Sequence, residues 1–264
     1  MRKMSMRHRI VLMMRQRMIV ILGGIALLQP ALMGSPYPPR PYPQLDTHPY
    51  REPRPPIAVP AGCDKLLSRG CAVTSSENDP LTGELSYITD GVKEYDDSTY
   101  VELGPGLQWV QIDLGGECEI HAVCIWHRID LSAHRDVICQ ISNDPKFNEG
   151  VVTVFNNDHD NSAGFGVGKE KEYIATSYGR PFAVDAVKGR YVRCYSRGNT
   201  LNEMNYYMEI EVFGKPLYIP QNGDGTKILS PVPTSKETAK IYENLSEPPT
   251  GKTWLKIDYP RRVW

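Results

Sequence analysis

Two runs near residue 200 alternate polar and apolar side chains residue by residue, and they constrain the possible fold more than any other feature. Gly189–Ser196 reads Gly-Arg-Tyr-Val-Arg-Cys-Tyr-Ser, and Met208–Gly214 reads Met-Glu-Ile-Glu-Val-Phe-Gly. A period of two residues is that of a β-strand with one buried face. A polar stretch, residues 197–205, separates the two runs. The pattern predicts two β-strands joined by a polar loop near the end of a domain.

The whole segment from Cys63 to Gly214 has a similar texture, with short alternating or apolar runs separated by turn residues. No stretch of convincing length has the period of a helix. Short strands separated by Gly, Asn and Asp predict an all-β sandwich, and about 150 residues suit one domain with one core. The expected strands are Gln108–Leu114, Ile120–His127, Asp136–Ser142, Val151–Asn156, Gly189–Ser196 and Tyr207–Phe213.

Residues 1–34 predict a targeting segment. They carry basic residues but no Asp or Glu, and the apolar run Met18–Leu28 lies behind the basic stretch. That run is short for a bilayer span and suits a signal peptide; an uncleaved N-terminal anchor is the alternative. We therefore expect a secreted, cell-surface or periplasmic protein, with membrane contact only through this segment if it is not cleaved.

The charge distribution argues against a nucleic-acid partner. The net charge of the chain is −1, and because residues 1–34 are basic, the remainder is mildly acidic. Nucleic-acid binding would need a clustered basic face, and none is visible in the sequence.

Proline-rich segments flank the expected domain. Residues 35–62 predict an extended linker, because closely spaced prolines favour polyproline II over a packed core. Residues 215–264 have a similar linker texture and predict an irregular C-terminal tail. We expect its apolar tip, Thr253–Tyr259, to dock onto the domain, because Trp254 and Trp264 are unfavourable in water.

Six cysteines are an even number in a chain expected to be exported, which allows disulfides. Cys63 and Cys71 flank the start of the domain and are the favoured pair. Cys124, Cys139 and Cys194 fall inside expected strands, where both disulfides and buried thiols remain open.

Six motifs follow one another along the chain: Leu66–Ser76, Ile88–Gly91, Trp109–Gly115, Ile138–Asp144, Arg190–Arg193 and Glu209–Gly214. In this order they resemble the motifs of discoidin domains, also called coagulation factor 5/8 type C or galactose-binding-like domains, the group that includes carbohydrate-binding modules. The resemblance implies an eight-stranded jelly-roll β-sandwich over residues 63–214, and it implies a binding module rather than an enzyme.

The same resemblance implies a structural calcium ion under the Asp90 loop. Its ligands would be Asp90, an acidic residue at 96 or 97 (we favour Asp97), Thr99, and Glu209 from the closing strand. Hard oxygen atoms of this kind are the ligands of calcium. Tyr100 departs from the tryptophan that is frequent in the family, and solvated loop carboxylates are the alternative reading.

Loops of the sandwich are the expected ligand site, since His, Arg, Asp and Asn hydrogen-bond to sugar hydroxyls and aromatic rings stack on sugars. Alternatively, Trp126 is core and Arg135 pairs structurally with Asp136. The loop at 156–168 is alternatively an ordinary polar surface loop. The predicted ligand-binding residues are His127, Arg128, His134, Arg135, Asp158, His159, Asn205 and Tyr206.

These features predict an exported, non-catalytic module that binds an extracellular carbohydrate. The alternative is a surface assembly or adhesion protein that binds another protein or a lipid. The loops read as polar, which favours sugar over lipid, because lipid-binding discoidin domains carry apolar loop tips. A hydrolase is disfavoured, because the His-Glu-x-x-His and Gly-x-Ser-x-Gly motifs are missing from the sequence.

Overall fold

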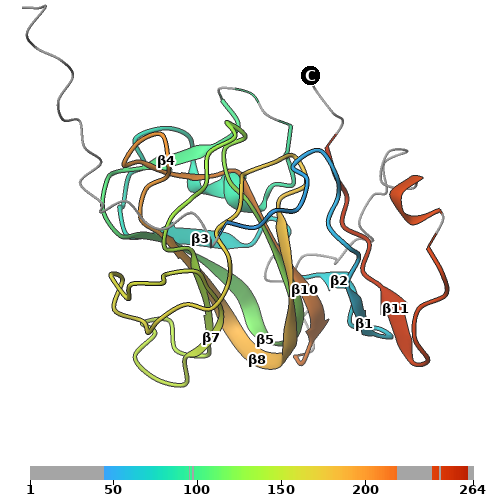
Figure 1. The fold of residues 1–264 in the computed structure, drawn as a ribbon. Helices are drawn as coiled ribbons and strands as arrows, with labels where there is room; N and C mark the ends of the chain where they lie inside the picture. Colours follow the sequence, from blue (N-terminus) through green and yellow to red (C-terminus); the bar gives the residue numbers. More distant parts are fainter. Residues whose placement is uncertain (1–44, 95, 97, 219–239, 244, 261–264) are drawn as a thin grey trace, which may run out of the picture. The chain divides into compact units, whose positions relative to one another are not determined.

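Strands make up nearly all of the regular structure in residues 45–94, 96, 98–218, 240–243 and 245–260, which the computed structural model describes (Figure 1). The predicted targeting segment lies outside these residues. In the described part of the chain, no helix combines the length and the apolar character needed to cross a membrane. The elements are β1 Ala58–Pro60, β2 Lys65–Leu66, β3 Ala72–Ser75, the 3-10 helix η2 Leu85–Thr89, β4 Val101–Leu103, β5 Gln108–Trp126, β6 Ile138–Ser142, β7 Val152–Asn156, β8 Arg180–Ser196, β9 Asn205–Tyr207, β10 Glu209–Pro216 and β11 Lys252–Trp254.

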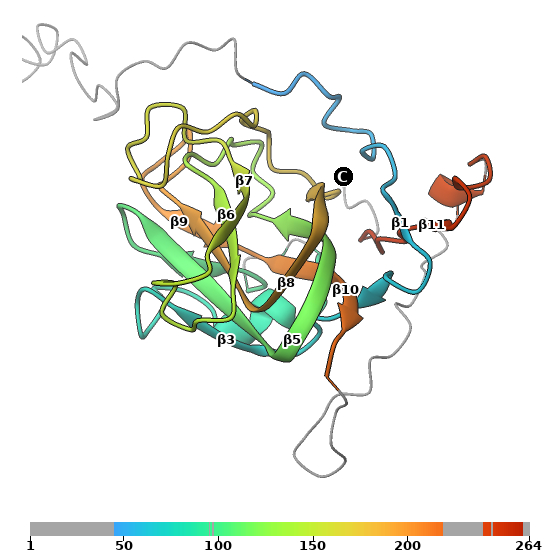
Figure 2. The same cartoon turned by 90° about the horizontal axis from the view of Figure 1, so that it is seen from below.

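Two long strands organise the main sheet. It has seven antiparallel strands in the order β2-β10-β5-β8-β6-β7, with β3 paired to β5. The first half of β5 lies between β3 and β8, whereas its second half lies between β10 and β8. The β5–β8 register shifts between Asp113 and Cys118, and Gly115 has a φ of 82° there. Such irregularities bend strands, and Figure 2 shows the curvature of both β5 and β8.

The two halves of the bent sheet enclose one core. Val110 and Ile112 come from the first half of β5, and Val123 and Ile125 come from its second half. Because one cluster takes side chains from both halves, the sheet forms two packed layers. The structure thus confirms the predicted β-sandwich. Further core members are Cys139, Ile141, Val192, Cys194, Ile210 and Val212.

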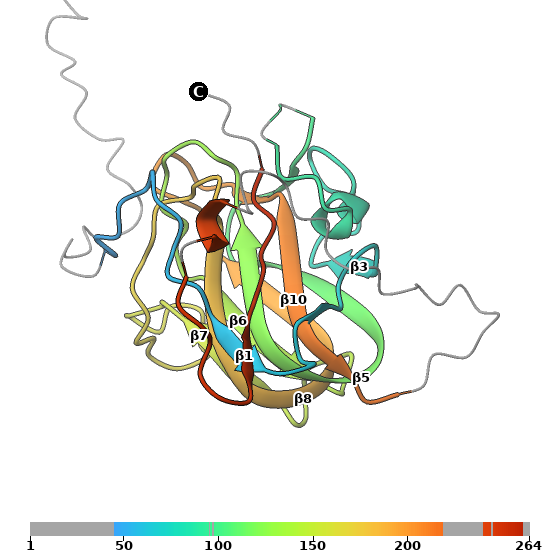
Figure 3. The same ribbon diagram turned by 90° about the vertical axis from the view of Figure 1, so that its right-hand side faces the viewer.

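A second apolar cluster covers the outer face of β2, β5 and β10. β1 and β11 pair there, with Ala58 opposite Trp254, and the Leu255 N–H donates to the Ile57 carbonyl oxygen at 2.8 Å. Figure 3 shows this β1–β11 pair lying over the sheet. The outer cluster contains Leu66, Ala122, Cys124, Trp126, Met208 and Phe213 from the sandwich, and Val59, Leu255, Ile257 and Tyr259 from the two flanking segments.

The folded unit therefore extends beyond the predicted domain 63–214 on both sides. Leu255, Ile257 and Tyr259 are 1%, 3% and 4% exposed, so the tip of the tail docks as expected. The indole N–H of Trp254 donates to the Ser246 carbonyl oxygen at 2.8 Å. The tail is not irregular throughout, because β11 belongs to it; Trp264 lies outside the described residues.

The structure differs from the sequence prediction in the length of β5 and in the pairing of Cys63. β5 is continuous through Gly115, where the sequence suggested two strands. The favoured Cys63–Cys71 disulfide is not formed, because the two residues pack on different sides of the sheet. Cys71 contacts the inner core and Cys63 lies at the outer face beside His121. Cys139 and Cys194 lie opposite each other on β6 and β8.

Candidate functional site

Polar and aromatic side chains gather around Arg128, just after β5 ends. Its guanidinium carbon lies 5.0 Å from the ring centroid of Tyr100 and 5.2 Å from that of Tyr206. The Tyr206 hydroxyl accepts a hydrogen bond from the Asn202 amide at 3.1 Å and donates one to Glu102 at 3.4 Å. We call these five residues, Tyr100, Glu102, Arg128, Asn202 and Tyr206, the Arg128 patch.

The short β4–β9 sheet places two members of the Arg128 patch side by side. Glu102 on β4 lies directly opposite Tyr206 on β9. The flanking residues on β4, Val101 and Leu103, are fully buried, whereas Glu102 between them is half-buried. The alternation of the strand therefore turns the Glu102 carboxylate away from the core.

The Arg128 patch offers hydrogen-bond donors and acceptors together. A guanidinium has five donors in fixed directions, a carboxylate only accepts, and an amide does both. Arg128 and Glu102 are half-buried and Asn202 is exposed, whereas Tyr100 and Tyr206 are 8% and 3% exposed. The two rings therefore position Arg128 and do not present a face for stacking. A sugar hydroxyl, which both donates and accepts, matches this set of groups.

Three predicted ligand residues lie beneath the Arg128 patch. The His127 ring bonds to the Tyr206 carbonyl oxygen through Nδ1 (2.7 Å) and to the Tyr173 hydroxyl through Nε2 (3.0 Å). The His134 ring stacks on it, with centroids 3.9 Å apart. The Asn205 side chain is enclosed and bonds to neighbouring loops. None of the three reaches the surface, which corrects the expectation that they face a ligand.

Burial determines the charge of the two stacked rings. Desolvation lowers the pKa of His127 to about 4, although the Tyr206 carbonyl opposes this shift. Desolvation, followed by the neighbouring His127 ring, lowers the pKa of His134 well below its usual range. Both rings are therefore neutral at pH 7 and act as packing groups.

The remaining predicted ligand residues lie outside the Arg128 patch. Arg135 is half-buried, and its backbone bonds to the 197–198 segment. Asp158 is fully buried and accepts two backbone N–H groups of its own loop. His159 bonds through Nε2 to the Glu170 carbonyl oxygen at 2.7 Å. Asp158 and His159 thus bond to the backbone of their own loop. The sequence had predicted that they point outward to a ligand.

Three aspartates meet where this loop contacts the segment before β6. One carboxylate oxygen from each of Asp136, Asp158 and Asp160 lies within 4.8 Å of the others. Asp136 accepts a hydrogen bond from the Ser162 hydroxyl at 2.9 Å. Burial is the largest cause that raises the pKa of Asp158. The sequence did not predict this contact between Asp136 and the loop that carries Asp158 and Asp160.

The residues expected to hold calcium meet in part. Asp90 is exposed, and Glu209 reaches its loop from β10, where Oε2 accepts the Gly91 N–H at 2.8 Å. The Thr99 hydroxyl donates within the same loop, to the Glu94 carbonyl oxygen at 2.9 Å. Asp97 lies outside the described residues.

Two fully buried carboxylates, Glu209 and Glu211, lie under the Asp90 loop beside the cations Lys93 and Arg69. Glu211 Oε1 lies 2.7 Å from the ammonium of Lys93. Glu209 Oε1 has no hydrogen-bond partner among the described residues. Burial, followed by the Glu211 charge, raises the pKa of Glu209 well above its usual range. An unsatisfied buried carboxylate oxygen fits a hard cation such as calcium.

Three exposed leucines lie in loops next to the Arg128 patch. Leu81, Leu131 and Leu201 are 61%, 57% and 65% exposed. Leu201 precedes Asn202, Leu131 follows Arg128 in the same loop, and the Leu81 N–H donates to the Glu102 carbonyl oxygen. The loop tips are therefore partly apolar, which corrects the expectation that they are polar. Leu131 also has a φ of 59°, a strained conformation for leucine.

Sequence reasoning missed Glu102 and Asn202 as site residues. The alternation Val101-Glu102-Leu103 is a strand signal that could have marked Glu102. Asn202 stood in a loop recognised as polar, but its contact with the Tyr206 hydroxyl requires the folded loop. Tyr100 was noticed only as a departure from the family pattern.

Neither family models nor curated proteins match this chain, whereas several solved structures match parts of it at TM-scores below 0.5. The family 89 glycoside hydrolase from Clostridium perfringens, in complex with GlcNAc-α-1,4-galactose, has a TM-score of 0.45 at 22% identity, over 68% of this chain and 18% of the hydrolase. A chitosan-binding module from the chitosanase/glucanase of Paenibacillus sp. IK-5 has a TM-score of 0.43 at 19% identity, over 57% and 99% of the two chains. A fucolectin from striped bass (Morone saxatilis) serum has a TM-score of 0.44 at 20% identity, over 58% and 49%. The chain thus spans less than a fifth of the hydrolase and about half of the lectin.

Proposed function

We propose that this chain is a non-catalytic module that binds a carbohydrate through the Arg128 patch. The observation that carries the proposal is the guanidinium of Arg128, which lies against two tyrosine rings beside Glu102 and Asn202. A guanidinium held in place by its neighbours loses little conformational freedom when it binds a ligand. The sandwich fold and the resemblance of its motifs to discoidin domains support the same proposal.

The composition of the Arg128 patch favours binding over hydrolysis. A glycosidase normally uses two carboxyl groups on opposite sides of the scissile bond. Among the five described residues of the patch, only Glu102 carries a carboxylate. We therefore expect a bound oligosaccharide to leave the protein unchanged, which incubation and mass analysis of the sugar would show.

A glycan array with the full chain tests the proposal, followed by calorimetry on the best ligand. The Arg128→Ala variant is expected to bind about 10-fold to 100-fold more weakly, since hydrogen bonds to charged groups contribute about 1.5–3 kcal/mol. Arg197→Ala is the matched control, because Arg197 is also half-buried and lies in the neighbouring loop. The proposal fails if no glycan binds, or if both variants lose the same affinity.

Export is part of the same proposal, because an extracellular glycan requires it. The basic and apolar pattern of residues 1–34 supports it. Expression in the source cell, followed by fractionation and N-terminal sequencing, would detect an exported chain and distinguish cleavage from anchoring. Recovery of the chain in the cytoplasmic fraction would contradict this part.

A second candidate function is adhesion to a lipid surface through Leu81, Leu131 and Leu201. Single exposed apolar residues are common, but here three lie in loops that adjoin the Arg128 patch. Sedimentation with phosphatidylserine–phosphatidylcholine vesicles tests it. Leu131→Asn with Leu201→Asn should abolish binding, while Asn tolerates the left-handed backbone of residue 131. Lipid adhesion is contradicted if the wild-type chain does not sediment with the vesicles. Carbohydrate binding is then the remaining function, provided that the wild-type chain binds a glycan.

We also propose that Glu209 and the Asp90 loop hold a structural calcium ion. The unsatisfied Oε1 of Glu209 supports this, and the loop offers carbonyl and carboxylate oxygens nearby. The ion would compensate the charge of Glu209, whereas Glu211 is already paired with Lys93, and it would fasten the loop to the sheet.

A further inference from the structure

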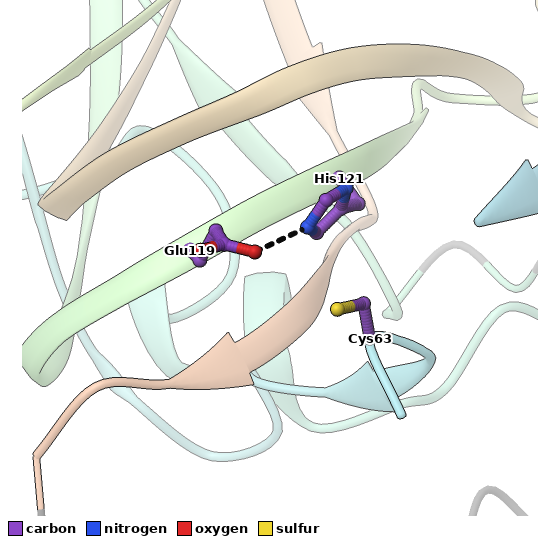
Figure 4. Close-up of side chains that lie close together, drawn as sticks. All are labelled: Cys63, Glu119 and His121. Carbon is purple, nitrogen blue, oxygen red and sulfur yellow. Dashed lines mark hydrogen bonds and ion pairs between the residues drawn. The ribbon is translucent and has the colours of Figure 1, made fainter. Parts of the chain in front are cut away.

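Cys63, Glu119 and His121 bring sulfur, oxygen and nitrogen ligand atoms to one place (Figure 4). One such atom from each side chain lies within 4.8 Å of the other two. His121 Nε2 and Glu119 Oε1 are 2.9 Å apart. Cys63 and His121 are 2% and 7% exposed, and Glu119 is half-buried. The cluster therefore lies just beneath the surface and is separate from both the Arg128 patch and the Asp90 loop.

The fold brings this cluster together from two distant segments. Glu119 and His121 lie two residues apart on β5, and the register irregularity between Ile120 and Ala122 leaves their side chains in contact. Cys63 follows β1 in a turn, where its N–H donates to the Pro60 carbonyl oxygen at 3.0 Å. The next strand, β2, pairs with β10, and β10 pairs with this half of β5.

Close packing of β10 against β5 keeps the cluster compact. A Cβ atom on Gly214 would lie 2.0 Å from the Glu119 carbonyl oxygen, so only glycine allows this approach. Lys215 follows at once, with its ammonium 3.2 Å from Glu119 Oε1. A positive charge thus already lies beside the carboxylate, and Lys215 is exposed enough to move away when another cation binds.

The chemistry of the three donors selects the kind of cation. Calcium and magnesium prefer oxygen ligands throughout. Cysteine, histidine and carboxylate together form a donor set typical of zinc, and three protein ligands commonly leave a fourth position for water. The two buried donors, a thiol and an imidazole, are those with the higher zinc preference.

We propose that Cys63, Glu119 and His121 bind a zinc ion that fastens the turn after β1 to β5. The ion would link the N-terminal flanking segment to the sandwich beside the outer cluster. None of the three residues belongs to the Arg128 patch, so we expect zinc binding to leave the proposed sugar site unchanged.

Zinc titration of the reduced, metal-free full chain against a competing chelator tests the proposal. The wild-type chain is expected to bind one zinc ion and to show a higher Tm with zinc. Cys63→Ser and His121→Gln should each weaken binding by more than about 10-fold, since even outer residues of metal sites contribute that much. Cys71→Ser and His48→Gln are matched controls outside the cluster, and both should bind zinc as the wild type does.

Cobalt substitution gives a readout that does not depend on stability. The wild-type chain with Co²⁺ should show thiolate-to-cobalt charge-transfer absorption, which Cys63→Ser loses and Cys71→Ser keeps. Absence of stoichiometric zinc binding would overturn the proposal, as would equal losses in the controls. Zinc binding with no thiolate absorption would also overturn it, since Cys63 would then not be a ligand.

Discussion

His134 is a buried residue beneath the Arg128 patch. It is 1% exposed, and neither ring nitrogen has a hydrogen-bond partner among the described residues. It stacks on His127, which is bonded at both nitrogens. A buried polar atom without a partner destabilises a fold by about 1–3 kcal/mol, so His134 is a local weak point beneath the Arg128 patch.

The histidine pair predicts a loss of stability in acid. The folded-state pKa values of His127 and His134 are lowered, so below pH 6.5 the unfolded chain binds protons that the folded chain does not. Stability is therefore complete above about pH 6.5 and falls toward pH 4, by at most about 1.4 kcal/mol per pH unit for each ring. Urea denaturation between pH 4 and pH 8 measures this slope.

The variant His134→Phe removes one of the two titrating rings and both unsatisfied nitrogens. We expect it to be more stable than the wild type, with a gain about 2 kcal/mol larger at pH 5 than at pH 8. Urea denaturation at the two pH values provides the comparison. An equal gain at both would show that His134 does not titrate as its burial implies.

The buried carboxylate of Glu209 predicts that calcium stabilises the folded protein. Calcium at 100 times its Kd would raise the free energy of unfolding by about 2.7 kcal/mol, seen as a higher Tm than in chelator. Glu209→Gln should abolish this response, and without calcium it should be no less stable than the wild type, because a neutral amide avoids burying a charge. Glu94→Gln, at an exposed position in the same loop, is the control. A wild-type Tm unaffected by calcium would contradict the proposed ion.

At the scale of elements, the β1–β11 pair closes the outer face of the sandwich. Alternation in the tail directs Leu255, Ile257 and Tyr259 inward, while Lys256 between them is exposed. The short pair has few hydrogen bonds of its own, so its attachment depends on these three side chains. The tail is thus held by burial of apolar surface.

Substitutions at two adjacent tail positions, one buried and one exposed, test whether burial of the side chain determines its contribution to stability. Leu255→Ala is expected to lower the free energy of unfolding by about 2–4 kcal/mol, the usual range for a buried leucine. Lys256→Ala should change it by less than about 0.5 kcal/mol. Chemical denaturation of both variants checks the difference. Similar small effects would mean that the tail is not packed on the sandwich in solution.

At the scale of the whole molecule, the segments that flank the sandwich cover an apolar face that the sandwich alone would expose. Without them, Ala122, Cys124 and Phe213 of the outer cluster would lose the cover of the β1–β11 pair. An exposed apolar face of this kind promotes association. The unit that folds is therefore larger than the expected domain of residues 63–214.

Two fragments compare these boundaries directly. Residues 45–264 should unfold at a higher urea concentration than residues 63–214, and the shorter fragment should bind a hydrophobic dye such as ANS. Equal midpoints and no dye binding would indicate that residues 63–214 suffice for the fold.

The candidate site was only partly predictable. Arg128 and Tyr206 were expected from the sequence and lie together in the patch. His127 and Asn205 are also polar and adjacent to them in the chain, yet they point inward. Residue type and neighbourhood in the sequence do not distinguish these cases, because the direction of a side chain in a loop depends on which distant segments pack against it.

What the sequence determined by itself is the strand content and the sandwich. The period of two in Gly189–Ser196 and Met208–Gly214 is a relation between neighbouring residues, and it needs no knowledge of the fold. The bend of β5 at Gly115, the cover of the outer face and the meeting of Cys63 with His121 were decided by the tertiary structure. Each depends on contacts between segments far apart in the chain, and a pattern among neighbouring residues does not specify such contacts.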